Sequence, residues 1–251
     1  MGKDNIGDRM KIGYEHAIEI HLLKRCPVVI RLDGKKFTNW TKGMERPYDA
    51  LLSDCMISAC VALSEEMQGF KLAYTQSDEA SFFISDYDTL ETEGWFGYDR
   101  DKIISVAAST FTAEFNKVFL KNIICKNASE NSTRTDILDI IRKYKMATFD
   151  CRAFNVPKDD VANYFLWRCK DWHRNSLSMY ARSFFSHKEL YEKNTKDVHE
   201  MLHKIGKNWT TDVSKRFKNG TFLNKDNEGN LIISHDATTH DAIYNVIMDC
   251  V

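Results

Sequence analysis

Asp33 and Gly34 are the first residues whose types and spacing point to chemistry. They follow the apolar residues at positions 28–30, whose β-branched side chains are typical of a buried strand. Lys35 and Lys36 come next, and a carboxylate at a strand end beside a glycine and two cations could hold a metal ion and a phosphate. Taken alone, the stretch favours a simpler interpretation, in which Asp33 occupies a turn at the end of a strand.

A second polar site is predicted at Ser77, Asp78 and Glu79. Residues 70–85 read as two short strands, with apolar side chains on both sides of these three polar residues. A turn at the tip of a hairpin also explains the composition, because serine and aspartate favour turns. Glu79 places a second carboxylate directly beside Asp78.

The order of the expected elements brings these two sites together. Apolar spacing predicts helices over residues 8–24, 50–67 and 101–120, and strands within 26–37, 70–85 and 147–154. From the first strand onward this is the βαββαβ order of ferredoxin-like folds, in which strands one and three are central and adjacent. Asp33 is therefore expected close to Asp78. Two converging carboxylates suit Mg²⁺, and a pair of such ions about 3.5–4 Å apart could activate both oxygens of a phosphoryl transfer.

The composition fits a globular protein with one large domain or two small ones. The chain has 251 residues, 43% of them hydrophobic and 28% charged, with a formal net charge of −1. That balance demands no polyanionic partner, so a nucleic-acid surface would have to be a local patch. We find no apolar run of transmembrane length and no signal-peptide core. The seven cysteines lack CxxC spacing, which predicts a cytoplasmic protein with reduced thiols.

The sequence changes character after Pro157. Residues 159–186 read as one long helix or a broken pair of helices, in which cations alternate with aromatic side chains. That interleaving suits contact with RNA, although a buried aromatic face with a solvated basic face explains it equally well. A helix is expected over 195–207, a hairpin of strands within 215–223 and 229–235, and a short helix over 241–251. Loops are expected over 86–100 and 121–135, and the whole chain reads as one compact unit.

An ordered set of short motifs resembles the tRNA-His guanylyltransferase family, including its branch of similar 3′–5′ RNA polymerases. Each motif is weak alone, but their order and spacing over residues 7–175 are specific. The blocks are GDRMK at 7–11 with Tyr14 and Glu15, RLDG at 31–34 with Phe37, RPYD at 46–49, YTQSDEASF at 74–82, Lys102 before SVAASTFTAEF at 105–115, FDCR at 149–152, Tyr164-Phe165 with Trp167-Arg168, and Asp171 with His173 and Asn175.

The resemblance implies an α+β fold: a polymerase palm-like, ferredoxin-like βαββαβ catalytic core over residues 1–157, and a helical and hairpin extension over 158–251. It implies a nucleotidyltransferase that adds nucleotides to the 5′ end of tRNA. ATP would first activate a 5′-monophosphate, or a 5′-triphosphate would be used directly, and the 3′-hydroxyl of incoming GTP or another NTP would attack the activated end. Two Mg²⁺ ions would be held by Asp33, Asp78 and the backbone carbonyl of Gly34.

The resemblance also assigns roles to residues around these ligands. The stretch from Asp33 to Thr38 would line the nucleotide triphosphate, with Lys35 and Lys36 near its charge, and Ser77 would contact the nucleotide. The complete set of expected nucleotide-binding residues is Asp33, Gly34, Lys35, Lys36, Phe37, Thr38, Arg46, Asp49, Ser77 and Asp78.

Four residues form the expected catalytic group: Asp33, Asp78, Arg46 and Glu79. Arg46 stands where the family usually has lysine and could bind phosphate through two hydrogen bonds. Asp49 either orients Arg46 or only caps the helix that follows it. Glu79 matches the family pattern but could act from behind the metal ligands.

One departure from the family pattern bears on the substrate. The dedicated guanylyltransferases carry HINNLYN on the long helix, where this chain has HRNSLSM at 173–179. The departure favours the branch that repairs 5′-truncated tRNA by templated addition over addition of one G to tRNA-His. A palm-fold nucleotide cyclase and a non-catalytic RNA-binding module remain alternatives, although both aspartates and Ser77 are present. The resemblance also implies a homotetramer.

Overall fold

One antiparallel sheet forms the centre of the molecule. The computed structural model describes residues 5–128, 133, 137–139, 142, 144–226, 228–236 and 239–249. The sheet has six strands in the order β4-β1-β3-β2-β5-β6, so the predicted adjacency of the first and third strands is confirmed. The strands are β1 Val28–Gly34, β2 Phe70–Gln76, β3 Glu79–Ile84, β4 Phe149–Asn155, β5 Thr221–Lys225 and β6 Leu231–Ser234.

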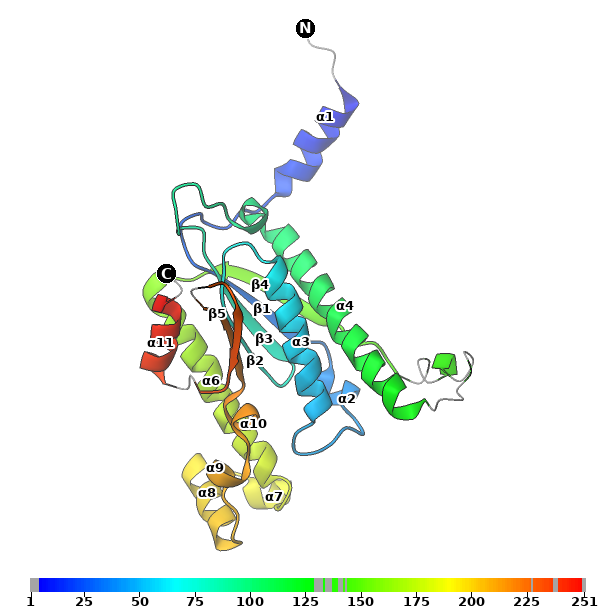
Figure 1. The fold of residues 1–251 in the computed structure, drawn as a ribbon, viewed down its shortest axis with the longest axis vertical. Coiled ribbons are helices and arrows are strands. Elements are labelled where there is room, and N and C mark those ends of the chain that lie inside the picture. The colour runs from blue at the N-terminus through cyan, green and yellow to red at the C-terminus, as the bar shows by residue number, and fades with distance from the viewer. Residues whose placement is uncertain are drawn as a thin grey trace.

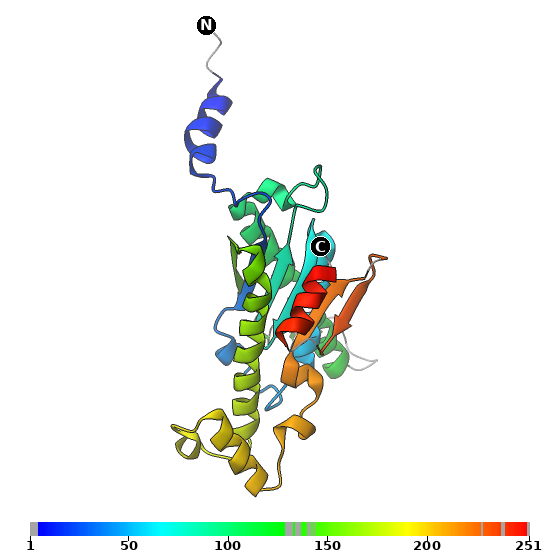
Figure 2. The ribbon, with the colours of Figure 1, turned by 90° about the vertical axis from the view of Figure 1, so that its left-hand side faces the viewer.

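Helices cover both faces of the sheet, as Figures 1 and 2 show. One face packs against α3 (Ala50–Glu66) and α4 (Arg100–Asn127), and the opposite face packs against α6 (Lys158–Ala181) and α11 (His240–Asp249). Each side of the sheet thus has its own apolar core. The residues from β1 to β4 follow the predicted order of strands and helices, with the short α2 (Phe37–Trp40) added after β1.

Alternation along β1 decides where its polar end points. Ile30 and Leu32 are fully buried in the core under α3 and α4, and Val29 is fully buried in the core under α6. Because successive side chains of a strand point to opposite faces, Arg31 and Asp33 lie on the α6 face. Burial of each of these apolar side chains stabilises the fold by about 1.5–3 kcal/mol, so the register of β1, and with it the direction of Asp33, is strongly specified.

The hairpin of β2 and β3 carries the second polar site. Gln76 pairs with Glu79, so Ser77 and Asp78 form a two-residue turn, with Ser77 in the left-handed region at φ 49°. The backbone N–H of Gly34 donates to the carbonyl oxygen of Asp78 over 3.0 Å. This bond ties the tip of the hairpin to the end of β1.

The N-terminal segment does not form the predicted helix over residues 8–24. It is helical only to residue 18, through α1 (Ile6–Met10), a π-helical turn (Lys11–Glu15) and a 3₁₀ turn (His16–Ile18). The segment stands away from the body (Figure 1), and the apolar side chains that were expected to pack are exposed, at 43% for Met10 and 73% for Ile18. The predicted helix is therefore wrong beyond residue 18, and of its expected apolar stripe only Leu22 packs against the core among the described residues.

Two loop boundaries also differ from the prediction. Helix α4 continues to Asn127, so the loop predicted over 121–135 is wrong at its start, and residues 129–132 and 134–135 of that prediction lie outside the described residues. A short 3₁₀ helix at Trp95–Tyr98 interrupts the loop predicted over 86–100.

None of the described helices is long and apolar enough to span a membrane.

The C-terminal region lengthens the sheet as well as adding helices. Helix α6 is a single helix, and it is followed by α7 (His187–Leu190), α8 (Thr195–Lys204), α9 (Trp209–Asp212) and α10 (Lys215–Asn219). Residues 215–219 were predicted as strand but form the helix α10. This helix ends at Gly220, at φ 78°, where a Cβ would lie 2.6 Å from the Tyr74 hydroxyl. The predicted hairpin then follows as β5 and β6, and the predicted closing helix is α11, with residues 250–251 outside the described residues.

Candidate active site

Two cavities meet at the turn between β2 and β3. We name them cavity 1, of about 390 Å³, and cavity 2, of about 430 Å³. The turn residues Ser77 and Asp78 line both of them. The complete shared wall is Gln76, Ser77, Asp78, Trp172, Met179 and Arg182.

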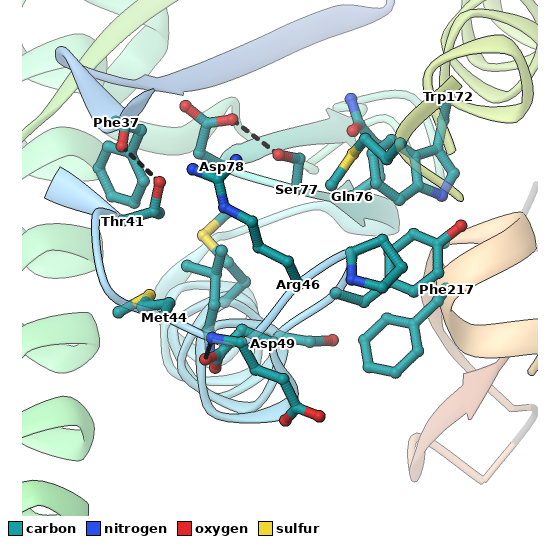
Figure 3. Close-up of a pocket in the computed structure, with 18 of the residues that line it drawn as sticks. Phe37, Thr41, Met44, Arg46, Asp49, Gln76, Ser77, Asp78, Trp172 and Phe217 are labelled. Carbon is teal, nitrogen blue, oxygen red and sulfur yellow. Dashed lines mark hydrogen bonds between the residues drawn. The ribbon is translucent and has the colours of Figure 1, made fainter. Parts of the chain in front are cut away.

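Cavity 1 lies between the two halves of the chain (Figure 3). Its walls come from α2 and the loop after it, the N-terminal turns of α3, the β2–β3 turn, the C-terminal end of α6, and the α10–β5 connection. Among the residues expected to bind nucleotide, it is lined by Phe37, Thr38, Arg46, Asp49, Ser77 and Asp78. Cavity 2 opens on the α6 face and is lined by Asp33, Glu79 and three arginines among others.

Asp33 and Asp78 come together as predicted from the order of the strands. Asp33 pairs in register with Glu79 on β3, and Asp78 is held next to β1 by the bond from the Gly34 N–H. The Asp78 carboxylate accepts a 3.0 Å hydrogen bond from the Ser77 hydroxyl. Burial raises the pKa of Asp78, the Ser77 hydrogen bond opposes that shift, and the nearby charges of Asp33 and Glu79 add to it.

This arrangement fits a hard divalent cation. Two carboxylates that repel each other across a partly buried cleft gain from a cation between them, and oxygen ligands are those that Mg²⁺ prefers. Across the described part of the chain, no group of three or more His, Cys, Asp and Glu side chains could hold a metal ion. A metal at this site would therefore rest on Asp33, Asp78, backbone oxygen and water.

Gly34 is required by packing rather than by a special backbone angle. A Cβ at this position would lie 2.3 Å from the ring of Phe37, which is 4% exposed. The ring contacts Trp40, Phe115 and Phe149. Phe37 thus lines cavity 1 from within the core, and it anchors the chain just after the predicted metal ligands.

The two lysines after Gly34 lie apart from the cavities. Lys35 and Lys36 are exposed, and neither belongs to the lining of cavity 1 or cavity 2. Lys36 has a left-handed backbone, with φ 56°, at the N-cap of α2. Thr38, two residues later, does line cavity 1.

Arg46 extends across cavity 1 toward Asp78 (Figure 3), and within the described residues it makes no ion pair. Asp49 does not pair with it. The Asp49 carboxylate instead accepts the backbone N–H of Leu52 over 2.9 Å and that of Glu45 over 3.0 Å, so the capping role is the one observed. Arg182 also lines the cavity and also lacks an ion pair among the residues described. Cavity 1 therefore offers two uncompensated guanidinium groups to a phosphate.

Glu79 does not face open solvent. It is 5% exposed, and Arg168 binds its carboxylate in a bidentate manner at 2.5 and 2.6 Å. Arg31 donates a further hydrogen bond to it over 2.6 Å. Glu79 thus lines cavity 2 with a carboxylate that is already bound by two arginines, and its role behind the metal ligands stays a prediction.

The comparisons with known proteins identify the family of the chain. A sequence profile of the family described as tRNAHis guanylyltransferase matches residues 7–157. The chain belongs to this family. The match confirms the predicted family and the predicted enzyme class, because its members are nucleotidyltransferases. Tyr164 and the later blocks of the resemblance lie beyond the matched segment.

Individual relatives of the tRNAHis guanylyltransferase family are similar over much of the chain. An uncharacterised protein of Acanthamoeba polyphaga mimivirus is 26% identical over 78% of this chain and 69% of its own length. The tRNA(His) guanylyltransferase of Saccharomyces cerevisiae is 27% identical over 66% of this chain and 65% of its own length. The chain thus spans about two thirds of the length of these curated relatives.

Solved structures extend the similarity to nearly the whole chain. A bacterial tRNA(His) guanylyltransferase-like protein in complex with ATP has a TM-score of 0.83 at 36% identity, covering 98% of this chain and 99% of its own. A bacterial protein of the same description in complex with GTP has a TM-score of 0.76 at 32% identity, with coverages of 98% and 99%. The mixed α/β fold with an antiparallel sheet is therefore confirmed.

Several lining residues of this family member were not predicted as part of the site. Gln76 stands inside the YTQSDEASF block but was not singled out, and its position beside Ser77 was the available signal. Trp172 comes from α6, Arg182 directly follows that helix, and Phe217 comes from α10. The sequence around Phe217 carries no motif, so only the three-dimensional fold reveals its place in the wall.

Phe217 is held in the wall of cavity 1 through Ser176. Its ring stacks on Tyr48, with centroids 5.0 Å apart and planes 5° apart. The hydroxyl of Ser176 donates to the Phe217 carbonyl over 2.8 Å and accepts the Trp209 indole N–H over 3.1 Å. Tyr48 also reaches Ser176, through its phenol hydroxyl. One buried serine on α6 thus joins the first half of the chain to α9 and α10.

The long helix does not present all of its cations to solvent. Arg168, predicted as one of the cations interleaved with aromatic side chains, is 5% exposed, whereas Arg174 pairs with Asp171 and keeps a side chain that is 70% exposed. The aromatic residues Phe165, Trp172 and Tyr180 are buried, while Trp167 is 53% exposed. The described helix therefore has a buried aromatic face, and Arg168 is not available for contact with RNA.

Proposed function

We propose that the protein is a metal-dependent 3′–5′ nucleotidyltransferase that adds nucleotides to the 5′ end of tRNA, as templated repair of 5′-truncated molecules. The observation that carries the proposal is the meeting of Asp33 and Asp78 at the junction of two cavities. Two substrates have to meet at one set of carboxylates in such a reaction, and this arrangement supplies room on both sides of Asp78.

Cavity 1 would bind the nucleotide. Its support is the pair of guanidinium groups of Arg46 and Arg182, the Ser77 hydroxyl, and apolar walls that include Phe217. A triphosphate is recognised by such cations, and a base by such apolar surfaces. The bacterial relatives in complex with ATP and with GTP support nucleotides of both kinds as substrates.

Asp33, Asp78 and the Gly34 carbonyl would hold two Mg²⁺ ions. When bound, the metal would supply Lewis-acid activation of the attacking and leaving oxygens of phosphoryl transfer. The protein itself contributes the position of the ligands. The β1–β3 register sets Asp33, the hairpin turn sets Asp78, and the Ser77 hydroxyl orients the Asp78 carboxylate.

The reaction would run in two steps at this site. The 5′-phosphate of the RNA attacks the α-phosphorus of ATP and releases pyrophosphate, which leaves an adenylylated 5′ end. The 3′-hydroxyl of the next nucleotide then attacks the 5′-phosphorus of the RNA, and AMP leaves. Arg46 and Arg182 would offset the charge that develops on the phosphates. An RNA that carries a 5′-triphosphate would omit the first step and release pyrophosphate in the second.

Repair is favoured over the dedicated addition of one G by the HRNSLSM stretch of α6. Ser176 of that stretch is fully buried and holds Trp209 and Phe217 in place, so this chain uses the position for its own packing. We further propose a palm-like core over 1–157 with an extension over 158–251. The end of the family match at residue 157 supports that division.

We also propose a homotetramer and a cytoplasmic location. The exposed apolar side chains of residues 6–18, such as Ile12 at 70% and Ile18 at 73%, support contact with further copies of the chain because a large exposed apolar surface indicates an interface. The six described cysteines are free thiols, in keeping with a reducing compartment.

A 5′-extension assay tests the proposal. The protein is incubated with a 3′-labelled tRNA that lacks its first nucleotide, with ATP, the other NTPs and Mg²⁺. We expect a product longer by the missing nucleotide, loss of that product in Asp33→Asn and Asp78→Asn, and unchanged yield in Asp159→Asn, whose carboxylate is exposed at the start of α6. Full extension by Asp78→Asn would contradict the proposed role of this carboxylate.

A dedicated tRNA-His guanylyltransferase is the second candidate, favoured by the names of the curated relatives. Full-length tRNA-His without its extra G serves as the competing acceptor. A higher kcat/KM on that acceptor than on truncated tRNA would establish this alternative. Cyclic nucleotide formed from GTP or ATP without RNA would indicate a cyclase, and tRNA binding without turnover would indicate an RNA-binding module.

A further inference from the structure

Glu79 is a buried anion with two cationic partners. The guanidinium of Arg168 reaches both carboxylate oxygens, with Nε 2.5 Å from Oε1 and Nη2 2.6 Å from Oε2. Arg31 shares the second oxygen, also at 2.6 Å. The Glu79 and Arg168 side chains are each only 6% exposed. Charge-assisted hydrogen bonds of this length, buried from solvent, hold the participating side chains in one geometry.

Arg31 lies between the carboxylates of Glu79 and Asp33 and is closer to that of Glu79. Its Nη2 is 2.6 Å from Glu79 and 3.8 Å from Asp33. Within the part of the chain that is described, these are the ion pairs that Arg31 makes, and its Nε is buried without a hydrogen-bond partner. Asp33 retains a side chain that is 43% exposed and lines cavity 2. Arg31 therefore leaves Asp33 open on the side of the cavity.

Arg168 fixes the orientation of Glu79. Its guanidinium lies over the ring of Trp167, with 4.4 Å between the carbon Cζ and the ring centroid, and its Nη2 is 3.4 Å from Asp171. Both contacts come from the same helix. The bidentate pair thus anchors the Glu79 carboxylate to α6 and turns Oε2 toward Arg31.

We propose that Glu79 is a positioning residue that holds Arg31 away from Asp33 and so keeps Asp33 free to bind a divalent cation, with Arg168 fixing Glu79 for this purpose. The inference rests on the proposed function, because the cation site is part of that proposal. Without the charge of Glu79, Asp33 becomes the only carboxylate that pairs with Arg31. A shift of about 1 Å closes that ion pair to the usual 2.7–2.9 Å, and the guanidinium then occupies an oxygen that the metal needs.

The test measures cation affinity without turnover. Mn²⁺, a hard cation with the same preference for oxygen ligands, is titrated into the full-length protein without nucleotide or RNA, and free Mn²⁺ is followed by electron paramagnetic resonance. Glu79→Gln should bind Mn²⁺ about 10–100-fold more weakly than the wild type, the range typical of residues that orient metal ligands. Arg31→Gln should bind at least as tightly as the wild type. The double variant Glu79→Gln/Arg31→Gln should recover the affinity of Arg31→Gln.

Recovery in the double variant separates this role from direct ligation. If Glu79 itself bound the cation, removal of Arg31 could not restore the affinity, so a double variant as weak as Glu79→Gln overturns the inference. Unchanged affinity in Glu79→Gln also overturns it. If wild-type protein binds no Mn²⁺, or if Asp33→Asn leaves the affinity intact, the proposed cation site fails and the inference fails with it.

A second pair of variants covers the case in which Glu79→Gln does not fold. Loss of the anion leaves the buried guanidinium of Arg168 beside the partly buried one of Arg31, whereas Glu79→Gln/Arg168→Gln removes one charge of each sign. Thermal unfolding identifies the variants that remain folded. The paired variant should bind Mn²⁺ weakly, and addition of Arg31→Gln to it should restore binding. Wild-type affinity in the paired variant, or no recovery in the triple variant, overturns the inference.

Discussion

Ser176→Ala should weaken both the fold and the binding of nucleotide in cavity 1. The hydroxyl of Ser176 is fully buried and accepts the indole N–H of Trp209 while it donates to the carbonyl of Phe217. Tyr48 retains the backbone carbonyl of Ser176 as an acceptor at 2.8 Å. The substitution therefore leaves the indole N–H and the Phe217 carbonyl without these partners.

The expected loss follows from those two groups. A buried donor or acceptor that loses its partner costs about 1–3 kcal/mol, and the Trp209 side chain, which is 9% exposed, has little access to water. For the two groups together we expect a total loss of about 2–6 kcal/mol in the free energy of unfolding. For a chain of this size that corresponds to a decrease in Tm of about 4–24 °C. Looser packing of Phe217 should also raise the KM for nucleotide about 3–10-fold.

Thermal unfolding and 5′-extension kinetics measure the two effects on the same preparation. Ser178→Ala is the matched control, because Ser178 lies on the same helix and its side chain makes no hydrogen bond within the described residues. It should stay within about 0.5 kcal/mol of the wild type. A loss below about 1 kcal/mol in Ser176→Ala, together with an unchanged KM, would refute the argument that Ser176 holds α10 against the nucleotide cavity.

Three further predictions concern other parts of the molecule. Burial raises the pKa of Asp78 in the folded state, so the free energy of unfolding should fall as pH rises from the ordinary aspartate pKa of about 3.9 through the raised value. The metal-free Asp78→Asn variant should therefore have a higher Tm than the wild type near pH 7 but not in strong acid. A lower Tm of the variant near pH 7 would contradict this. Gly34→Ala should lower Tm by several degrees because its Cβ would meet the Phe37 ring, whereas Gly13→Ala, with nothing within 4 Å, should not, and equal Tm values for the two variants would count against the packing role of Gly34. Deletion of residues 1–18 should convert a tetramer into a smaller species, as measured by light scattering. A tetramer that persists after the deletion would show that these residues are dispensable for assembly.

Local sequence was sufficient to predict those features that depend only on residues within one helix, strand or turn. The β-branched run before Asp33 predicted a buried strand, and its alternation also determines the face on which Asp33 lies. Helix capping was one of the two roles expected for Asp49, and its carboxylate accepts the N–H of Leu52. The polar residues Ser77 and Asp78 between apolar strands form the expected turn. In each case neighbouring residues along the chain carry the physical cause.

Sequence was insufficient where the partner lies far along the chain. Arg168 looked like a surface cation among aromatic side chains, but its partner Glu79 is 89 residues away. Phe217 reaches cavity 1 only because α10 packs beside α6 and Tyr48. The apolar stripe of residues 8–24 predicted a helix, yet an amphipathic pattern does not specify what covers it. Long-range contacts of this kind require the three-dimensional fold.

Labelling of the RNA at its 5′ end tests the central claim most directly. A 5′-truncated tRNA with a ³²P-labelled 5′-monophosphate is incubated with the protein, ATP, unlabelled NTPs and Mg²⁺. The product is treated first with a pyrophosphatase that cleaves any adenylylated 5′ end and then with phosphatase. Our account predicts that wild-type protein converts the label into a phosphatase-resistant internal phosphodiester, and that Asp33→Asn and Asp78→Asn do not. A label that remains sensitive to phosphatase after incubation with the wild type, or equal protection by Asp78→Asn, would contradict the claim that these two carboxylates carry 3′–5′ nucleotide addition.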